Sequence, residues 1–185
     1  MASFVGTTLQ RKKMINTELQ QILEKNNILY GETNTQPPFR VVCRNYATDS
    51  MVTDTIGIED GQYIFHRKET AHADGGKGHH APIVEFFLDT DKTPLLTFDR
   101  VRLMGYPVEP YVMRIIDLDY LLKELFDKIG YTLVDFEAGF GKDSDGRFLV
   151  NKLDIDNMTI WKKNVENKHL IGAHKYILKH LLEVS

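Results

Sequence analysis

Two acidic side chains, Asp135 and Glu137, stand two residues apart in a stretch rich in β-branched and aromatic residues, which predicts a strand. Successive side chains of a strand point to opposite faces, so both carboxylates are expected on one face. Such a pair can divide the roles of acid and base in catalysis, or it can hold a ligand. The alternative is a structural network neutralised by cations, for which the candidates are Arg44, Lys152 and Arg147.

Three other polar residues occupy positions that favour binding. Arg44 ends a predicted strand over residues 39–44, and Asn45 opens the polar segment that follows, where binding residues commonly lie. Glu85 is the one charge in the apolar run PIVEFFL, residues 82–88, so it is expected to pair with a cation or to line the same cleft. Trp161 is expected to pack in the core or at its rim.

Residues 66–80, HRKETAHADGGKGHH, combine four of the seven histidines with three glycines. Such a composition is compatible with a metal site or a glycine-rich anion cradle. Neither a phosphate-binding loop ending in Gly-Lys-Ser/Thr nor a helical His-Glu-x-x-His pattern occurs there. A surface loop is therefore the favoured interpretation.

The elements that must position these residues form an α+β pattern. Residues 131–140 and 147–153 predict a hairpin around a polar turn at 142–146, in which Gly146 is free to take a positive φ. Apolar spacing and capping residues predict a mainly antiparallel sheet with helices packed on one side. Further strands are predicted at 39–44, 61–66 and 82–88, and helices at 7–25, 50–55, 99–104, 109–129 and 167–183.

Composition narrows the class of protein. The chain has 185 residues, a formal net charge of −3 and one cysteine, Cys43. This charge gives no general attraction for nucleic acid or anionic membranes, and no apolar run is long enough to span a bilayer. The single cysteine suits a reducing compartment. We therefore expect a cytoplasmic protein without nucleic-acid or membrane partners.

Three runs of the sequence resemble the family of phosphoribosylaminoimidazole-succinocarboxamide synthase (SAICAR synthetase). They are VVCRNYATDSMVTDTIGIEDG, PIVEFFLDTDKTPLLTFDRVRLMG and LVDFEAGFGKDSDGRFLVNKLDIDNMTIW, in the family's order and spacing. The resemblance implies two α+β lobes with a cleft between them. It also implies a reaction that uses ATP and magnesium to join aspartate to a carboxylated aminoimidazole ribonucleotide. Arg44, Ser50 and Asp135 match family positions that contact the substrate.

Several positions depart from the family pattern. Glu137 replaces the lysine of a DFK motif, Gly139 replaces a metal-binding glutamate, and Asn151 replaces an aspartate. Lys152 and Thr159 replace a further acid and an arginine. Magnesium prefers carboxylate oxygens, so these changes predict no metal site, no cofactor and no ATP-dependent ligase chemistry. The chain is also expected to lack the family's N-terminal ATP-binding lobe, which leaves residues 1–185 as a single domain.

Three hypotheses follow. The first is a protein that binds a nucleotide or phosphoribosyl-type molecule without catalysis, in a sequestering or regulatory role. The second is an enzyme with altered, ATP-independent lyase or hydrolase chemistry, with Asp135 and Glu137 as the catalytic candidates, or a retained synthetase. The third is an interaction module that self-associates into a homo-oligomer. The expected ligand-binding residues are Arg44, Asn45, Ser50, Glu85, Asp135 and Glu137.

Overall fold

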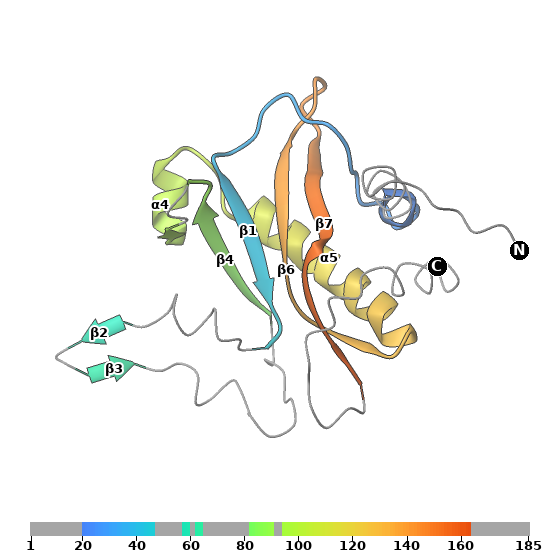
Figure 1. Ribbon diagram of the computed structural model, residues 1–185. Helices are drawn as coiled ribbons and strands as arrows, with labels where there is room; N and C mark the ends of the chain where they lie inside the picture. Colours follow the sequence, from blue (N-terminus) through green and yellow to red (C-terminus); the bar gives the residue numbers. More distant parts are fainter. Residues whose placement is uncertain (1–19, 47–56, 60–61, 65–81, 91–93, 164–185) are drawn as a thin grey trace, which may run out of the picture.

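The computed structural model describes residues 20–46, 57–59, 62–64, 82–90 and 94–163. Its centre is a five-stranded sheet in the order β5-β4-β1-β6-β7, in which every neighbouring pair is antiparallel (Figure 1). The strands are β1 (Phe39–Arg44), β4 (Ile83–Leu88), β5 (Leu95–Leu96), β6 (Tyr131–Lys142) and β7 (Phe148–Lys162). A separate two-stranded ribbon joins β2 (Gly57–Glu59) to β3 (Gln62–Ile64).

Successive side chains of β1 point to the two opposite faces of the sheet. Phe39, Val41 and Cys43 belong to the hydrophobic core, which also contains residues of the long helix α5 (Glu109–Lys128). Arg40 and Arg44 alternate with them and therefore belong to the opposite face. Helix α5 runs behind the sheet in Figure 1, so this opposite face is turned toward the viewer.

Helix α5 forms as its apolar spacing predicts. Its buried residues recur on one side of the helix, Pro110 stands in its first turn, and Gly130 follows its end with φ = 80°. The predicted boundaries, 109–129, are therefore confirmed to within one residue. Among the described residues, no helix is both long enough and apolar enough to cross a membrane.

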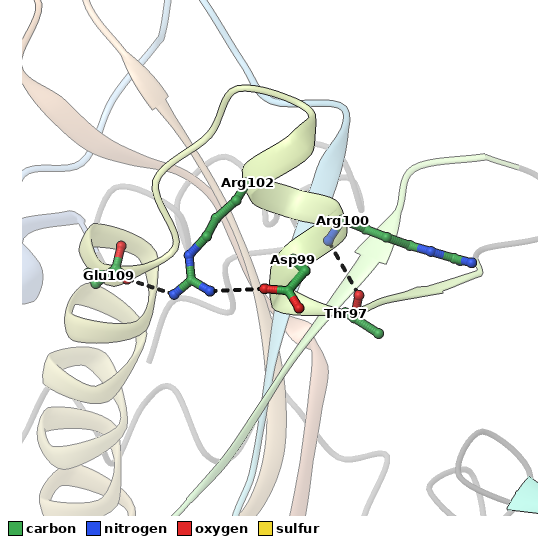
Figure 2. Close-up of polar contacts among 5 residues, drawn as sticks. All are labelled: Thr97, Asp99, Arg100, Arg102 and Glu109. Atoms are coloured by element: carbon green, nitrogen blue, oxygen red, sulfur yellow. Dashed lines mark hydrogen bonds and ion pairs between the residues drawn. The ribbon is translucent and has the colours of Figure 1, made fainter.

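Helix α4 (Phe98–Leu103) is linked to the start of α5 by exposed charged side chains (Figure 2). Thr97 caps α4 by accepting a hydrogen bond from the Arg100 amide at 3.3 Å. The Arg102 guanidinium donates to Asp99 at 3.3 Å and to Glu109 at 2.8 Å. The hydrogen bond from Arg102 lowers the pKa of Glu109. Because the network is exposed, its main effect is to align the two helices rather than to stabilise the fold.

The β6–β7 hairpin confirms the predicted turn. Gly146 has φ = 79°, and Asp143 Oδ1 accepts hydrogen bonds from the backbone amides of Asp145 and Arg147, both at 2.9 Å. Strand β7 extends nine residues beyond the predicted end at 153, because three register irregularities bend it and keep it paired with β6.

The other predicted elements have mixed outcomes. The strands predicted at 39–44 and 82–88 and the helix at 99–104 are confirmed, and the helix predicted at 7–25 is present over its described part, 20–25. The strand predicted at 61–66 corresponds to β3, but its partner β2 was not predicted. The predicted helices at 50–55 and 167–183 and the loop 66–80 lie outside the described residues.

Gly141 marks a close approach between β6 and the segment that precedes β1. A Cβ atom at this position would lie 2.4 Å from the Thr35 carbonyl oxygen and 2.7 Å from Thr33. Thr35 is held there because it exchanges backbone hydrogen bonds with Lys142. The segment that precedes β1 can therefore lie this close to β6 only because residue 141 has no side chain.

Gly141→Ala is accordingly expected to lower the free energy of unfolding by about 1–3 kcal/mol, because backbone must move to admit the methyl group. Urea unfolding followed by circular dichroism measures the change. Gly31→Ala is the matched control, since its Cβ would make only an ordinary contact, 4.0 Å from Leu149. Equal stabilities for the two variants would contradict the close approach.

Candidate functional site

Five charged residues of β1, β4 and β6 share the sheet face opposite α5, and we call this group the polar sheet face. Strand register places Asp135 of β6 beside Arg44 of β1, and places Glu85 and Glu137 on either side of Val42. The structure thus brings together four of the six predicted ligand-binding residues. The polar sheet face consists of Arg40, Arg44, Glu85, Asp135 and Glu137.

Arg44 and Glu85 form the buried centre of this face. Only 5% of Arg44 and 7% of Glu85 are exposed, and Arg44 Nε donates to Glu85 Oε2 at 2.5 Å. A second guanidinium nitrogen, Nη1, lies 3.8 Å from Asp135 Oδ2. Glu85 therefore pairs with a cation, which was one of its two predicted roles. These contacts fix the plane of the guanidinium, since a buried charge is tolerated only when it is paired.

Glu137 has a different partner from those predicted. Its Oε2 lies 2.9 Å from Arg40 Nε, and its Oε1 accepts a hydrogen bond from Asn157 at 2.9 Å. The Arg40 contact is an ion pair by distance but lacks the alignment of a hydrogen bond. The expected pairing of a β6 carboxylate with Arg44 is confirmed for Asp135 only. The expected pairing with Arg147 is wrong, because Arg147 binds Asp143 and Asp145 in the turn.

Phe87 supports both arginines of the polar sheet face. The guanidinium carbons of Arg40 and Arg44 lie 5.4 Å and 5.9 Å from the centre of its ring. Such cation–π contacts favour a guanidinium over the ring face. The two positive charges can lie near one ring because three carboxylates surround them, which leaves the polar sheet face with one excess negative charge.

Asn45 does not join the polar sheet face, although it is adjacent to Arg44 in the chain. Its side chain donates to Asp119 Oδ1 of α5 at 2.6 Å, and both residues are buried. Lys123 Nζ lies 2.7 Å from the other oxygen of Asp119. Burial raises the pKa of the Cys43 thiol and the Asp119 carboxylate raises it further, which leaves Cys43 an unreactive core side chain. Ser50 lies outside the described residues.

Positions 139 and 151 carry no carboxylate, and they pack against each other. A Cβ atom on Gly139 would lie 2.7 Å from Asn151 Oδ1 and 2.7 Å from Lys152 Cβ. Asn151 is itself held in place, because its Nδ2 donates to Thr33 Oγ1 at 2.7 Å. Magnesium prefers several hard anionic oxygens, so these two residues do not fit that ion. Among the described residues, no group of three acidic, histidine or cysteine side chains has metal-binding geometry.

Gly139→Glu is expected to lower the free energy of unfolding by about 1–3 kcal/mol and to add no magnesium binding, because its Cβ would displace Asn151 and Lys152. Urea unfolding measures the first effect and calorimetric titration with magnesium chloride measures the second. Gly139→Ala should show most of the loss in stability. A stable Gly139→Glu variant that binds magnesium would show that the packing is easily displaced.

Two hollows formed by described residues lie away from the polar sheet face. One, of about 650 Å³, lies between the C-terminal half of α5 and the start of β6, where Lys123, Lys128 and Lys163 each pair with an acid. The other, of about 290 Å³, lies at the opposite end of the sheet. The charged residues that could do chemistry and the larger hollow therefore do not coincide. The polar sheet face is the stronger candidate for a site, because the acids in the larger hollow already neutralise its lysines.

This fold occurs in solved SAICAR synthetases. One such structure, described as in complex with ADP, aligns with 99% of this chain and 81% of its own at a TM-score of 0.66 and 18% identity. The Saccharomyces cerevisiae enzyme, described as complexed with SAICAR, aligns with 100% of this chain and 75% of its own at a TM-score of 0.60 and 14% identity. At these identities the likeness establishes the fold.

Sequence comparison identifies the protein family to which the chain belongs. The SAICAR synthetase family model matches residues 1–182, so the chain belongs to the SAICAR synthetase family. Phosphoribosylaminoimidazole-succinocarboxamide synthase from Staphylococcus epidermidis is 31% identical over 136 residues, which are 70% of this chain and 51% of the relative. The Staphylococcus carnosus enzyme is 32% identical over 134 residues. The chain spans about half the length of these curated relatives.

Proposed function

We propose that this protein binds a nucleotide or phosphoribosyl-type small molecule on the polar sheet face, without ATP-dependent ligase chemistry. The observation that carries the proposal is the fixed Arg44, paired with Glu85 and Asp135 on a face that also presents Glu137. In this proposal Arg44 and Ser50 contact phosphate or ribose, and Asp135 accepts a hydrogen bond from a ribose hydroxyl. Asn45 and Glu85 hold the end of β1 in place.

The relatives support the ligand class. One solved family structure is described as bound to ADP and another as bound to SAICAR, and both share this fold. Arg44 and Asp135, which match the family's substrate-contacting positions, lie within 3.8 Å of each other here. A ligand that meets both needs an anionic group and a hydroxyl in close proximity, as a ribose phosphate has.

The charge of the polar sheet face refines the ligand. The two arginines and three carboxylates of the polar sheet face leave one excess negative charge, and within the described residues Glu137 forms an ion pair with Arg40 alone. A highly anionic ligand would therefore meet repulsion that a ligand carrying an amine would not. The absence of carboxylates at Gly139 and Asn151 supports the proposal that no magnesium–ATP complex is used here.

Titration calorimetry tests the proposal with AMP, ribose 5-phosphate, ADP-ribose and aminoimidazole ribonucleotide. At least one should bind with one-to-one stoichiometry, and Asp135→Asn should weaken that ligand about tenfold, the effect of one hydrogen bond to a charged group. Glu124→Gln, on the exposed side of α5, is the control and should bind as the parent does. If none of the four binds, the ligand class is wrong.

The ligase part of the proposal needs its own assay. The protein is mixed with ATP, magnesium, aspartate and carboxylated aminoimidazole ribonucleotide, and phosphate release is followed. We expect no release above background. Release that depends on all three substrates would establish synthetase activity and would overturn this part of the proposal while leaving ligand binding intact.

The second candidate function is ATP-independent lyase or hydrolase chemistry. It is favoured by the placement of Asp135 and Glu137 on one face, each with a different arginine, because unlike environments let two carboxylates act as acid and base. Incubation with a cell extract followed by mass spectrometry distinguishes the two. Loss of one metabolite and appearance of another indicates turnover, whereas retention of one unchanged species indicates binding.

We also propose that the protein forms a homo-oligomer. Leu95 of β5 and the nearby α4 residues Phe98 and Leu103 are exposed, with Leu103 at 87%. An edge strand beside exposed apolar side chains favours association with a second copy. Light scattering on the purified chain should give more than the monomer mass, and a monomer at every concentration would reject the proposal.

A further inference from the structure

The smaller hollow lies where three segments meet at the end of the sheet. The first is the segment 35–37 before β1, the second is the connection from α4 into α5, and the third is the tip of the β6–β7 hairpin. Its volume is about 290 Å³, which is at the lower end for ligand pockets and suits a molecule of one or two rings. It shares no residue with the polar sheet face.

Its walls are aromatic and firmly held. Tyr111 packs edge-on against Phe39, Phe140 and Phe148, with ring centres 5.2, 5.8 and 5.0 Å away. Phe148 stacks on Phe140 at 5.4 Å. Tyr106 and three prolines complete the apolar lining. Because these rings support one another, the hollow would keep its shape when empty, and a flat ring could enter without reorganisation.

Tyr111 supplies a hydroxyl donor to this lining. Only 6% of the residue is exposed, its hydroxyl oxygen is not fully enclosed, and the hydroxyl makes no hydrogen bond within the described part of the chain. Burial, assisted by Tyr106, raises the pKa of Tyr111 to about 12, so the hydroxyl keeps its proton at neutral pH. A protonated hydroxyl that makes no hydrogen bond to the described part of the protein can donate to an acceptor on a ligand in the hollow.

The charge of the lining specifies the kind of acceptor. Among the described residues that line the hollow, Lys142 is the one that carries a charge, and it makes no ion pair with another described residue. None of the described residues that line the hollow is acidic. A hydroxyl donor and an ammonium group around an aromatic wall match a ring that carries a carboxylate.

We propose that this hollow is a binding site for a small aromatic carboxylate. The ring lies among Tyr106, Tyr111 and Phe148, and the carboxylate accepts from the Tyr111 hydroxyl and pairs with Lys142. The site is independent of the polar sheet face, and either can be occupied without the other.

Ligand-observed NMR with benzoate and indole-3-carboxylate tests this proposal on the intact chain. At least one should bind saturably, and its neutral analogue, benzyl alcohol or indole-3-methanol, should bind about tenfold more weakly. Tyr111→Phe and Lys142→Gln should each weaken the carboxylate about tenfold. Tyr120→Phe and Lys128→Gln are matched controls on exposed positions of α5 and should leave binding unchanged.

The outcomes are distinct. No saturable binding by either probe overturns the proposal. Equal binding by the acid and its neutral analogue, or binding unaffected by both Tyr111→Phe and Lys142→Gln, overturns the assigned chemistry. Because Lys142→Gln is on the surface, it remains informative if Tyr111→Phe is poorly folded. Nucleotide titration of the same variants should be unchanged, which separates this site from the polar sheet face.

Discussion

Arg44→Met is expected to lower the free energy of unfolding by about 3–5 kcal/mol, the cost of leaving buried charges without their partner. The change keeps most of the side-chain volume but removes the cation that Glu85 and Asp135 share. Both carboxylates would then lie in a largely buried position next to an apolar chain. Urea unfolding at neutral pH measures the loss.

Two comparisons isolate this effect. Arg114→Met removes an exposed ion pair, 3.8 Å from Asp117, and should cost no more than about 1 kcal/mol. The double change Arg44→Met with Glu85→Gln should cost less than the two single changes added together, because it leaves no unpaired charge at Glu85. If the losses in unfolding free energy of the two single variants simply add in the double variant, Arg44 and Glu85 do not have the energetic coupling that the structure indicates.

Asp119→Ala is expected to lower the free energy of unfolding by about 2–4 kcal/mol. None of Asp119 is exposed, and its carboxylate binds both Asn45 and Lys123. Removing it leaves the Asn45 amide without its acceptor and opens a cavity beside Cys43. Thermal and urea unfolding measure the change.

The control is two residues away on the same helix. Asp117→Ala removes an exposed carboxylate with one weak ion pair and should change stability by no more than about 0.5 kcal/mol. We expect Asp119→Ala also to weaken the ligand of the polar sheet face, since Asn45 fixes the end of β1 next to Arg44. Unchanged affinity in a stably folded Asp119→Ala variant would assign Asp119 a purely structural role.

Much of the fold could be predicted because its signals are local. The hairpin turn depends on Gly146 and Asp143, and helix α5 depends on an apolar stripe that ends at Gly130. The short ribbon strand β2 was missed because three residues carry too little periodicity. The extension of β7 was missed because its pairing depends on irregular register with β6, which no short pattern encodes.

The candidate site could be predicted in part for the same reason. The grouping of Asp135 with Glu137 follows from the two-residue period of a strand. That period could also have identified Arg40, which is on the face of Arg44, and could have placed Asn45 on the other face. Asp119 could not be found, because it lies 74 residues from Asn45 and its stretch of helix looks like any amphipathic surface.

The close packing around Gly139 also limits the length of a bound molecule. Asn151 lies over Gly139 on the same side of β6 as Asp135 and Glu137. Its side chain therefore blocks a ligand from extending further along β6 at this end of the polar sheet face. From Asp135 to Gly139 the strand advances about 13 Å, at about 3.3 Å per residue. A molecule that binds Arg44 and lies along β6 would meet the Asn151 side chain after roughly this distance. Compact mononucleotides should therefore bind better than longer nucleotide derivatives, and AMP should outcompete ADP-ribose.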